Sequence, residues 1–331
     1  MIAVGAVIGV AGFAYEQTHA DWRPHTTRTA AGWRVSQPYL GVNEPSLAGD
    51  YVVWQAGPYT IVMDLRSGKN RLVGDARDAQ SLAPPDASRQ AAVWAEYSSG
   101  PDDTNLVYAY DFSSGRRLRL LQTHANLGAS PVVAGETVDW LSGSGSATTV
   151  VSCDIASGRR RVLARGNDLG PFLFADGPFV AWSRQTRPSA PFTLVVFDTS
   201  TGTTVDLALP GQSGATFDAP VLAKGTLVWQ RIAGQSDTIN AYDFNDLVGR
   251  QIATGPLVGT PGFDGTTVVW AQRVAGRTGY TIMARRLAVG AAFQVARVAR
   301  PVQSVMVSGD TVAWWAGNGQ RSWLQTASLS R

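Results

Sequence analysis

The chain has 331 residues, a net charge of only +3, three histidines and a single cysteine. One cysteine excludes an intramolecular disulfide, and the histidine and cysteine counts exclude the usual zinc sites. The basic clusters, such as Arg116-Arg117 and Arg159-Arg160-Arg161, fall at separate turns and form no continuous stripe, so no nucleic-acid partner is expected. We also expect no metal and no cofactor.

The N-terminus carries an apolar segment, from Ile2 to Tyr15, followed by Thr18-His19-Ala20. A short apolar core followed by small residues is typical of a secretory signal peptide, although no basic residue precedes it here. At about 14 residues the segment is short for a membrane span, which needs about 20, so a cleaved signal is favoured over the two alternatives, an uncleaved anchor and a buried element. We predict a signal peptide or anchor over residues 1–20 and a flexible polar segment over 21–32. The protein is then exported, to the periplasm, the cell envelope or the medium.

Tryptophan recurs every 40 to 47 residues along the rest of the chain, and self-similarity at such a period indicates a repeat architecture. Each of these tryptophans ends a short run of valine, alanine, threonine or aromatic residues, which favours a strand. A Gly-Asp or Asp-Gly type turn precedes most runs. The repeated residues are Trp54, Trp94, Trp140, Trp182, Trp229, Trp270 and Trp314.

A proline stands nine residues before the tryptophan in five units, and Pro171 stands eleven before it in a sixth. Because proline lacks an N–H, it suits the first position of a strand, and we expect it to begin the first strand of each unit. The five are Pro45, Pro85, Pro131, Pro220 and Pro261.

A second turn of the form Asp-x-x-x-Gly follows a third strand, as in Asp64 to Gly68 and Asp154 to Gly158, and a fourth strand comes after it. In two later copies the turn is altered: it lengthens between Asp243 and Gly249 and has lost its aspartate near Arg286. Four antiparallel strands in about 43 residues, repeated seven times, predict a seven-bladed all-β propeller.

The last unit lacks a fourth strand at the C-terminus. The segment Gly32–Gln37 has strand character and precedes the first unit, so we predict that this N-terminal strand closes the ring and removes two unpaired edges. Residues 33–331 then form a single propeller domain, which we expect to be monomeric.

The sequence contains no recognisable catalytic constellation. His124 is the one histidine among the propeller loops, and no G-x-S-x-G elbow is present to hold a nucleophilic serine. A pair of loop carboxylates could still serve a glycosidase, with Glu44, Asp78, Asp168 and Asp218 as candidates beside Glu96 and Asp139. Each of these is better explained as a turn cap or a solvated group. The repeated tryptophans are expected in the core, and a sugar-stacking platform is the alternative.

Functional residues are expected in the loops that lead from each fourth strand to the next first strand, at one end of the ring. These loops differ between repeats and would surround the mouth of the central channel, with acidic and amide groups over most blades and a basic sector at the last. We predict binding by Asn43, Glu44, Asp78, His124, Asn126, Asn167, Asp168, Asp218, Arg297 and Arg300.

The repeat resembles the TolB-like (PD40-type) β-propeller repeat of bacteria, which is related to the WD40 repeat. The segments Pro131 to Trp140 with Asp154 to Gly158, and Pro261 to Trp270, carry this resemblance, whereas the Gly-His pair of true WD40 repeats is missing. The resemblance implies a secreted or periplasmic propeller that binds other proteins, and no catalytic residue carries over. We therefore expect a non-enzymatic module that binds a protein or a glycan. The alternative is a carbohydrate-active hydrolase or lyase.

Overall fold

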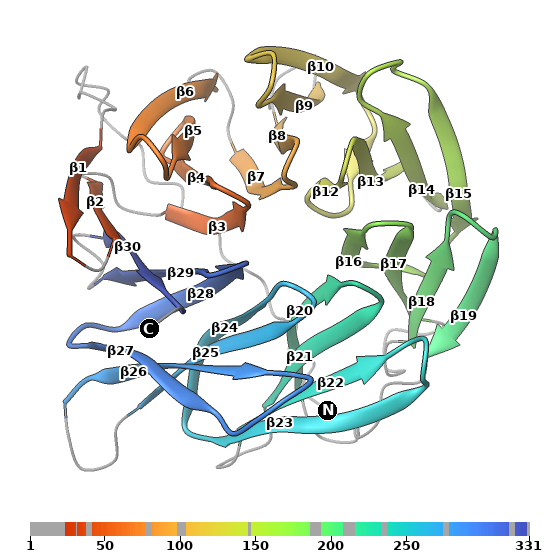
Figure 1. Cartoon of the computed structure of the whole chain (residues 1–331). Helices are drawn as coiled ribbons and strands as arrows, with labels where there is room; N and C mark the ends of the chain where they lie inside the picture. The colour runs from red at the N-terminus through yellow and green to blue at the C-terminus, as the bar shows by residue number, and fades with distance from the viewer. Residues whose placement is uncertain are drawn as a thin grey trace, which may run out of the picture.

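The structure is a computed structural model that describes residues 24–30, 32–37, 42–76, 81–97, 104–144, 147–185, 193–207, 216–232, 237–273, 278–317 and 322–329. All regular structure in these residues is β-strand. Strands of valine, threonine and aromatic residues alternate with Gly-containing turns, and each group of four pairs antiparallel in chain order. Figure 1 shows these groups arranged as blades in a ring, with the first strand of each blade nearest the middle.

Blades 1 to 3 contain twelve strands and one short extra strand, β11, that also pairs with β13. Blade 1 is β3 (Val42–Ala48), β4 (Tyr51–Ala56), β5 (Tyr59–Asp64) and β6 (Lys69–Asp75). Blade 2 is β7 (Ser81–Ala87), β8 (Ala91–Tyr97), β9 (Asn105–Asp111) and β10 (Arg116–Thr123). Blade 3 is β11 (Asn126–Leu127), β12 (Val132–Ala134), β13 (Thr137–Ser144), β14 (Ala147–Asp154) and β15 (Arg160–Gly166).

Blades 4 to 6 follow the same order. Blade 4 is β16 (Leu169–Asp176), β17 (Phe179–Arg184), β18 (Thr193–Asp198) and β19 (Thr203–Leu207). Blade 5 is β20 (Thr216–Ala223), β21 (Thr226–Ile232), β22 (Asp237–Asp243) and β23 (Val248–Gly255). Blade 6 is β24 (Leu257–Phe263), β25 (Thr267–Arg273), β26 (Tyr280–Arg286) and β27 (Phe293–Val298).

Blade 7 joins the two ends of the chain, as predicted. It consists of β28 (Val302–Ser308), β29 (Thr311–Gly317), β30 (Ser322–Ser328) and the N-terminal β2 (Gly32–Gln37). β2 pairs antiparallel with β30, with Val35 opposite Leu324, and both side chains are fully buried. In Figure 1 the red strands β1 and β2 lie beside the dark blue β30. The seven-bladed, strand-closed propeller predicted from the sequence is therefore confirmed.

The polar segment that precedes β2 contains a strand where flexibility was expected. β1 (His25–Thr29) pairs with β2 along its whole length, from His25 opposite Ser36 to Thr29 opposite Gly32. The proposed signal peptide or anchor over residues 1–20 lies outside the described residues. In the part of the chain that the structure describes, no helix is long and apolar enough to cross a membrane.

Trp33 of β2 fixes the closing strand to blade 1 as well as to blade 7. Its backbone N–H donates to Oγ1 of Thr326 at 2.7 Å, and its indole N–H donates to the carbonyl of Leu65 at 2.6 Å. The ring packs on Gly68, whose backbone has a φ of +71° and where a Cβ atom would come within 2.3 Å of the indole. Glycine is needed at residue 68 for both reasons.

The prolines mark a bulge inside the first strand of a blade, and the prediction that they begin this strand is wrong for most blades. Pro131 does precede β12, but in β3, β7, β16, β20 and β24 the strand starts two to four residues before the proline. The pairing register shifts at these points, for example between Asn43 and Ser46 and between Ala83 and Asp86. Proline has no N–H to donate to the ladder, so the bulge is where the strand can accept it.

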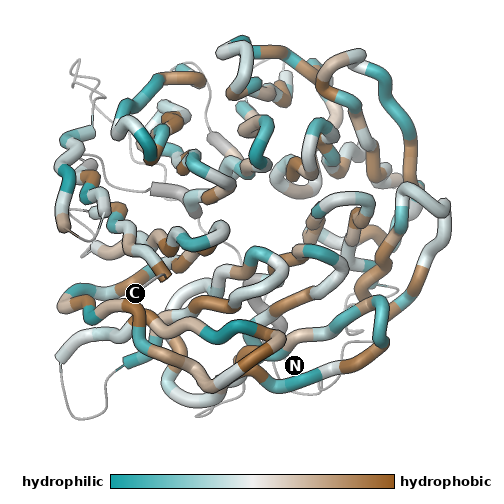
Figure 2. Tube along the Cα trace, in the orientation of Figure 1, coloured by the Kyte–Doolittle hydropathy of each residue, from teal (hydrophilic) through white to brown (hydrophobic). Residues whose placement is uncertain are grey.

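The repeated tryptophans lie in the core between blades, as expected, with exposed fractions between 0 and 5%. Trp94 packs with Val53 and Val62 of the preceding blade, and Trp140 packs with Val93 of its own preceding blade. Cys153 of β14 is also buried. Figure 2 shows hydrophilic stretches on the outer strands β10, β15 and β23. The apolar surface is thus buried mainly between neighbouring blades, which explains the regular spacing of tryptophan.

The turns between third and fourth strands are held by the predicted aspartates. The Asp64 carboxylate accepts a hydrogen bond from the backbone N–H of Arg66 at 2.8 Å, and Asp198 accepts one from Ser200 at 2.8 Å. In blade 5 the turn is not longer, contrary to the prediction. Asp243 accepts from the N–H of Asn245, and Leu247 takes the glycine position with a φ of +55°.

Leu247→Gly is expected to raise the free energy of unfolding by about 1 kcal/mol. A left-handed conformation costs a residue with a Cβ about 1–2 kcal/mol, part of which is offset by the greater chain entropy of glycine in the unfolded state. The Leu247 side chain is 63% exposed, so its removal costs few packing contacts. Urea denaturation measures the change, and Gly202→Leu, at a φ of +73°, should have the opposite effect. A destabilised Leu247→Gly variant would contradict the argument.

Candidate functional site

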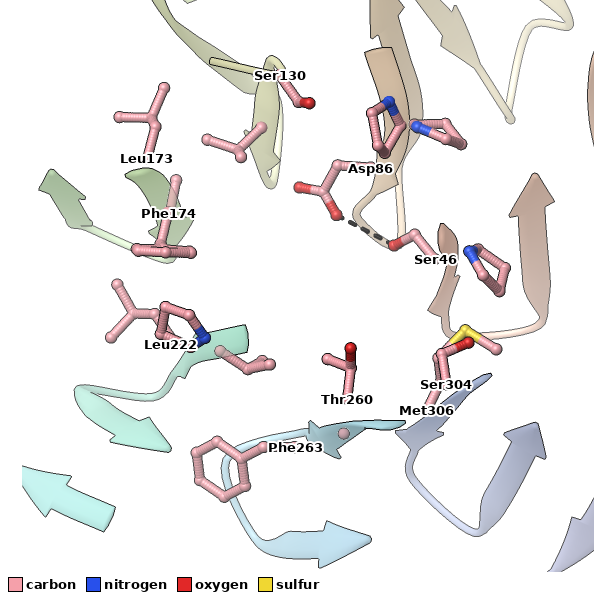
Figure 3. Close-up of a pocket in the computed structure, with 18 of the residues that line it drawn as sticks. Ser46, Asp86, Ser130, Leu173, Phe174, Leu222, Thr260, Phe263, Ser304 and Met306 are labelled. Carbon is pink, nitrogen blue, oxygen red and sulfur yellow. Dashed lines mark hydrogen bonds between the residues drawn. The ribbon is translucent and has the colours of Figure 1, made fainter. Parts of the chain in front are cut away.

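A cavity of about 470 Å³ lies on the axis of the ring and is lined by the first strands of all seven blades. Its described lining is mostly apolar, with prolines from blades 1 to 6 and larger apolar side chains from blades 4 to 7, namely Leu173, Phe174, Leu222, Phe263 and Met306. Serine and threonine hydroxyls from Ser46, Ser130, Thr260 and Ser304 interrupt this surface. Figure 3 shows these residues facing one another from different strands across the middle of the ring.

Asp86 is the only ionisable residue in the described lining of this cavity. One carboxylate oxygen accepts a hydrogen bond from the Ser46 hydroxyl at 3.0 Å, and the other accepts one from the backbone N–H of Val133 at 2.9 Å. Asp86 thereby links blade 2 to blades 1 and 3. Figure 3 shows its carboxylate beside Ser46, pointing into the cavity.

The environment of Asp86 disfavours its charge. Desolvation raises the pKa of Asp86 above its ordinary value, while hydrogen bonds from Val133, Ala87 and Ser46 lower it and the charge of Asp176 raises it further. Among the described residues, no cationic side chain forms an ion pair with it. A carboxylate offers about four acceptor positions, so Asp86 keeps acceptor capacity beside the hydrogen bonds from Ser46, Val133 and Ala87.

The repeat explains how the sequence places this residue. In every blade the residue eight positions before the repeated tryptophan lies in the first strand and lines the cavity. Only blade 2 has a charged residue there. The set is Ser46, Asp86, Val132, Phe174, Val221, Gly262 and Met306. Aligning the seven units on tryptophan would have singled out Asp86, which we did not predict as a site residue.

None of the residues predicted to bind whose side chain is described lines the cavity. His124, Asn126 and Asn167 are exposed. Asp78 lies outside the described residues, and the side chains of Asn43, Glu44 and Asp218 are not described, although their backbones belong to β3 and β20.

The remaining three predicted residues have partners of their own. The Asp168 carboxylate accepts a hydrogen bond from Nε of Arg184 at 2.9 Å. Nε of Arg297 donates to the side-chain oxygen of Gln294 at 3.4 Å. The guanidinium of Arg300 stacks on the ring of Trp323, with 4.0 Å from Cζ to the ring centroid. The six predicted residues whose side chains are described are therefore spread over different blades and are not gathered in one pocket.

The other carboxylates considered for catalysis are buried in the blades. Glu96 accepts hydrogen bonds from the indole N–H of Trp94 at 2.9 Å and from Arg117 at 3.0 Å. Asp139 is fully buried within blade 3. Among the described residues, no three His, Cys, Asp or Glu side chains come close enough together to hold a metal ion.

Several outer-strand arginines lie over aromatic rings of the blades. The guanidinium Cζ of Arg117 is 3.9 Å from the centroid of Tyr108, and those of Arg160 and Arg161 lie 6.0 and 5.8 Å from the centroids of Trp140 and Phe197. Stacking of this kind accounts for basic residues at these positions without a phosphate ligand.

Four-stranded blades around a lined axial cavity define the protein as a β-propeller. The chain matches no protein-family model and no curated protein. Among solved structures it is similar to an oligogalacturonate lyase in complex with manganese, with a TM-score of 0.61 and 12% identity over 93% of this chain and 96% of that chain. The propeller domain of the Trilobed protease from Pyrococcus furiosus has a TM-score of 0.61 and 10% identity, over 88% and 96%.

TolB from Acinetobacter baumannii is also similar, with a TM-score of 0.49 and 11% identity over 92% of this chain and 79% of that chain. At these identities the comparisons show the β-propeller fold alone, and the neighbours include both enzymes and TolB.

Proposed function

We propose that the chain is an exported, non-enzymatic binding module that holds a segment of a partner protein in its axial cavity. The observation that carries this proposal is the composition of the cavity, in which one carboxylate is surrounded by apolar side chains and a few hydroxyls. Apolar surface with a few polar groups is typical of binding pockets. The resemblance of the repeat to TolB-like propellers supports export and a protein partner.

A protein partner fits this cavity better than a glycan. Sugars present many hydroxyl groups, which need several polar partners when they leave water. The described lining offers one carboxylate and four hydroxyls among many proline and other apolar side chains.

A hydrolase or lyase that uses loop carboxylates is the alternative and receives less support. Such chemistry needs two carboxyl groups about 5–10 Å apart across a pocket. The described lining of the cavity holds one carboxylate, and Asp168 is engaged by Arg184. Turnover of a polysaccharide, ester or peptide by the purified protein, lost in an Asp86→Asn variant, would favour this alternative.

Ser130→Trp is the variant that tests the binding function. Ser130 precedes β12 on the cavity lining, so an indole there should fill part of the cavity and reduce partner binding at least tenfold. The matched control is Val205→Trp on the outer strand β19, where the side chain is 47% exposed. Pull-downs from a cell-envelope extract, with melting temperatures of all three proteins, give the comparison. Equal capture by the two variants would place the binding site outside the cavity.

A further inference from the structure

The axial cavity contains an acid without a counter-ion, and this feature specifies its ligand more closely. We infer that Asp86 receives the guanidinium of an arginine side chain inserted into the cavity by a partner protein. This inference rests on the proposed function, because it names the chemistry by which the same cavity would bind. It concerns a residue that sequence reasoning did not select.

Charge complementarity is the first argument. The hydrogen bonds that described residues donate to the Asp86 carboxylate come from neutral groups, the Ser46 hydroxyl and the backbone N–H groups of Val133 and Ala87. No other ionisable side chain belongs to the described lining, so nothing there balances its charge. A low-dielectric site around an unbalanced carboxylate attracts a cation more strongly than the solvated surface does.

Unused hydrogen-bonding groups are the second argument. Ser304 lines the cavity, is 94% buried, and its hydroxyl has no hydrogen-bond partner among the described residues. A buried polar group without a partner is rare in folded proteins and calls for a ligand or a solvent molecule. Asp86 and Ser304 come from blades 2 and 7, which lie on either side of blade 1.

The apolar lining favours arginine over a small cation. A guanidinium is planar, carries five N–H donors and is more weakly hydrated than an ammonium group, so its transfer out of water costs less. Its three-carbon stem can lie along the proline and phenylalanine side chains of the lining. Metal ions prefer several oxygen ligands with negative charge, and the described lining supplies one carboxylate.

The probe for this inference is N-acetyl-arginine N-methylamide, compared with the corresponding citrulline compound. Citrulline has nearly the same shape and no charge. Ligand-observed NMR should give a dissociation constant in the millimolar range for the arginine probe and at least tenfold weaker binding of the citrulline probe. Asp86→Asn should weaken binding of the arginine probe at least tenfold, because the strongest hydrogen bonds are those between charged partners.

Two control variants separate this role from a structural one. Asp206→Asn makes the same change in net charge at a carboxylate that is 58% exposed on the rim, and it should bind the probe like the wild type. Ser46→Ala removes a hydrogen bond from Asp86 but keeps the carboxylate, so it should weaken binding less than Asp86→Asn does, even if the melting temperature falls. Equal binding of the two probes, or equal binding by Asp86→Asn and Asp206→Asn, would overturn the inference.

The Ser130→Trp pull-down tests the proposed function separately from the arginine inference. If the arginine probe fails while Ser130→Trp still loses its partner, the cavity binds a partner through other chemistry. If Ser130→Trp still binds its partner, the proposal that the axial cavity binds a partner is wrong.

Discussion

Replacing Trp182 with alanine is expected to lower the free energy of unfolding by about 3–5 kcal/mol, through lost burial and the cavity left behind. The Trp182 side chain is 3% exposed and packs with Leu141 and Val150 of blade 3 and with Val195 of its own blade. Its environment is therefore the contact between two blades, where neighbouring strands restrict collapse around a void.

Urea denaturation with an unchanged m-value measures this loss. Phe293→Ala is a suitable control, because Phe293 is an aromatic residue of the outer strand β27 with 36% exposure, and its loss should cost much less. A loss below about 1 kcal/mol for Trp182→Ala would mean that the ring contributes little to the core, and a binding role would need to be reconsidered.

Replacing Asp139 with valine is expected to stabilise the protein, and increasingly so as the pH rises. Asp139 precedes Trp140, and in the other six blades this position is valine or alanine. The Asp139 side chain is fully buried, and neither carboxylate oxygen has a hydrogen-bond partner among the described residues. Burial raises the pKa of Asp139 to about 7, although Ser152 and Arg161 oppose this change.

The direction of the pH dependence follows from this raised pKa. Below about pH 4 the carboxyl group is protonated in both the folded and the unfolded protein. Between about pH 4 and pH 7 the folded protein keeps the proton and the unfolded chain loses it, so the free energy of unfolding falls as the pH rises. Above pH 7 both forms are ionised and the loss is complete, at about 4 kcal/mol for a difference of about 3 pKa units.

Denaturation of the wild type and Asp139→Val at pH 4 and pH 8 tests this expectation. The gain in stability from valine should be larger at pH 8 by a few kcal/mol. Asp139→Asn should also remove the pH dependence, but it leaves a buried amide and should gain less stability than valine. An equal gain from valine at both pH values would mean that Asp139 does not change its protonation between them.

The fold was predictable because one residue type reports on it in every blade. Each tryptophan fills the contact with the preceding blade, so its spacing gives the number of blades, and the position of Gly32–Gln37 before the first unit gives the closing strand. The predicted details that proved wrong, such as the strand starts at the prolines, depend on tertiary contacts. A proline in a sequence signals a missing N–H, but whether the strand starts there or bulges there is decided by pairing with the next strand.

The candidate site was less predictable for a related reason. The variable connections between blades drew attention to residues such as Asn167 and Asp168, whereas the cavity is lined by positions inside the repeat. Asp86 could have been found as the one charged residue eight positions before a tryptophan. Its contacts with Ser46 and Val133 join three blades, and such distances depend on how the blades pack around the axis.

The pairing of β2 with β30 has a consequence for how the molecule is made. Trp33 emerges from the ribosome early, but its hydrogen-bond partner Thr326 is 293 residues further along the chain. Contacts between residues so distant in sequence form slowly, because the chain entropy lost in closing the loop is offset only once the contacts are made. Blades can form from local hairpins during synthesis, yet the edge of β2 that pairs with β30 stays open until β30 has been translated.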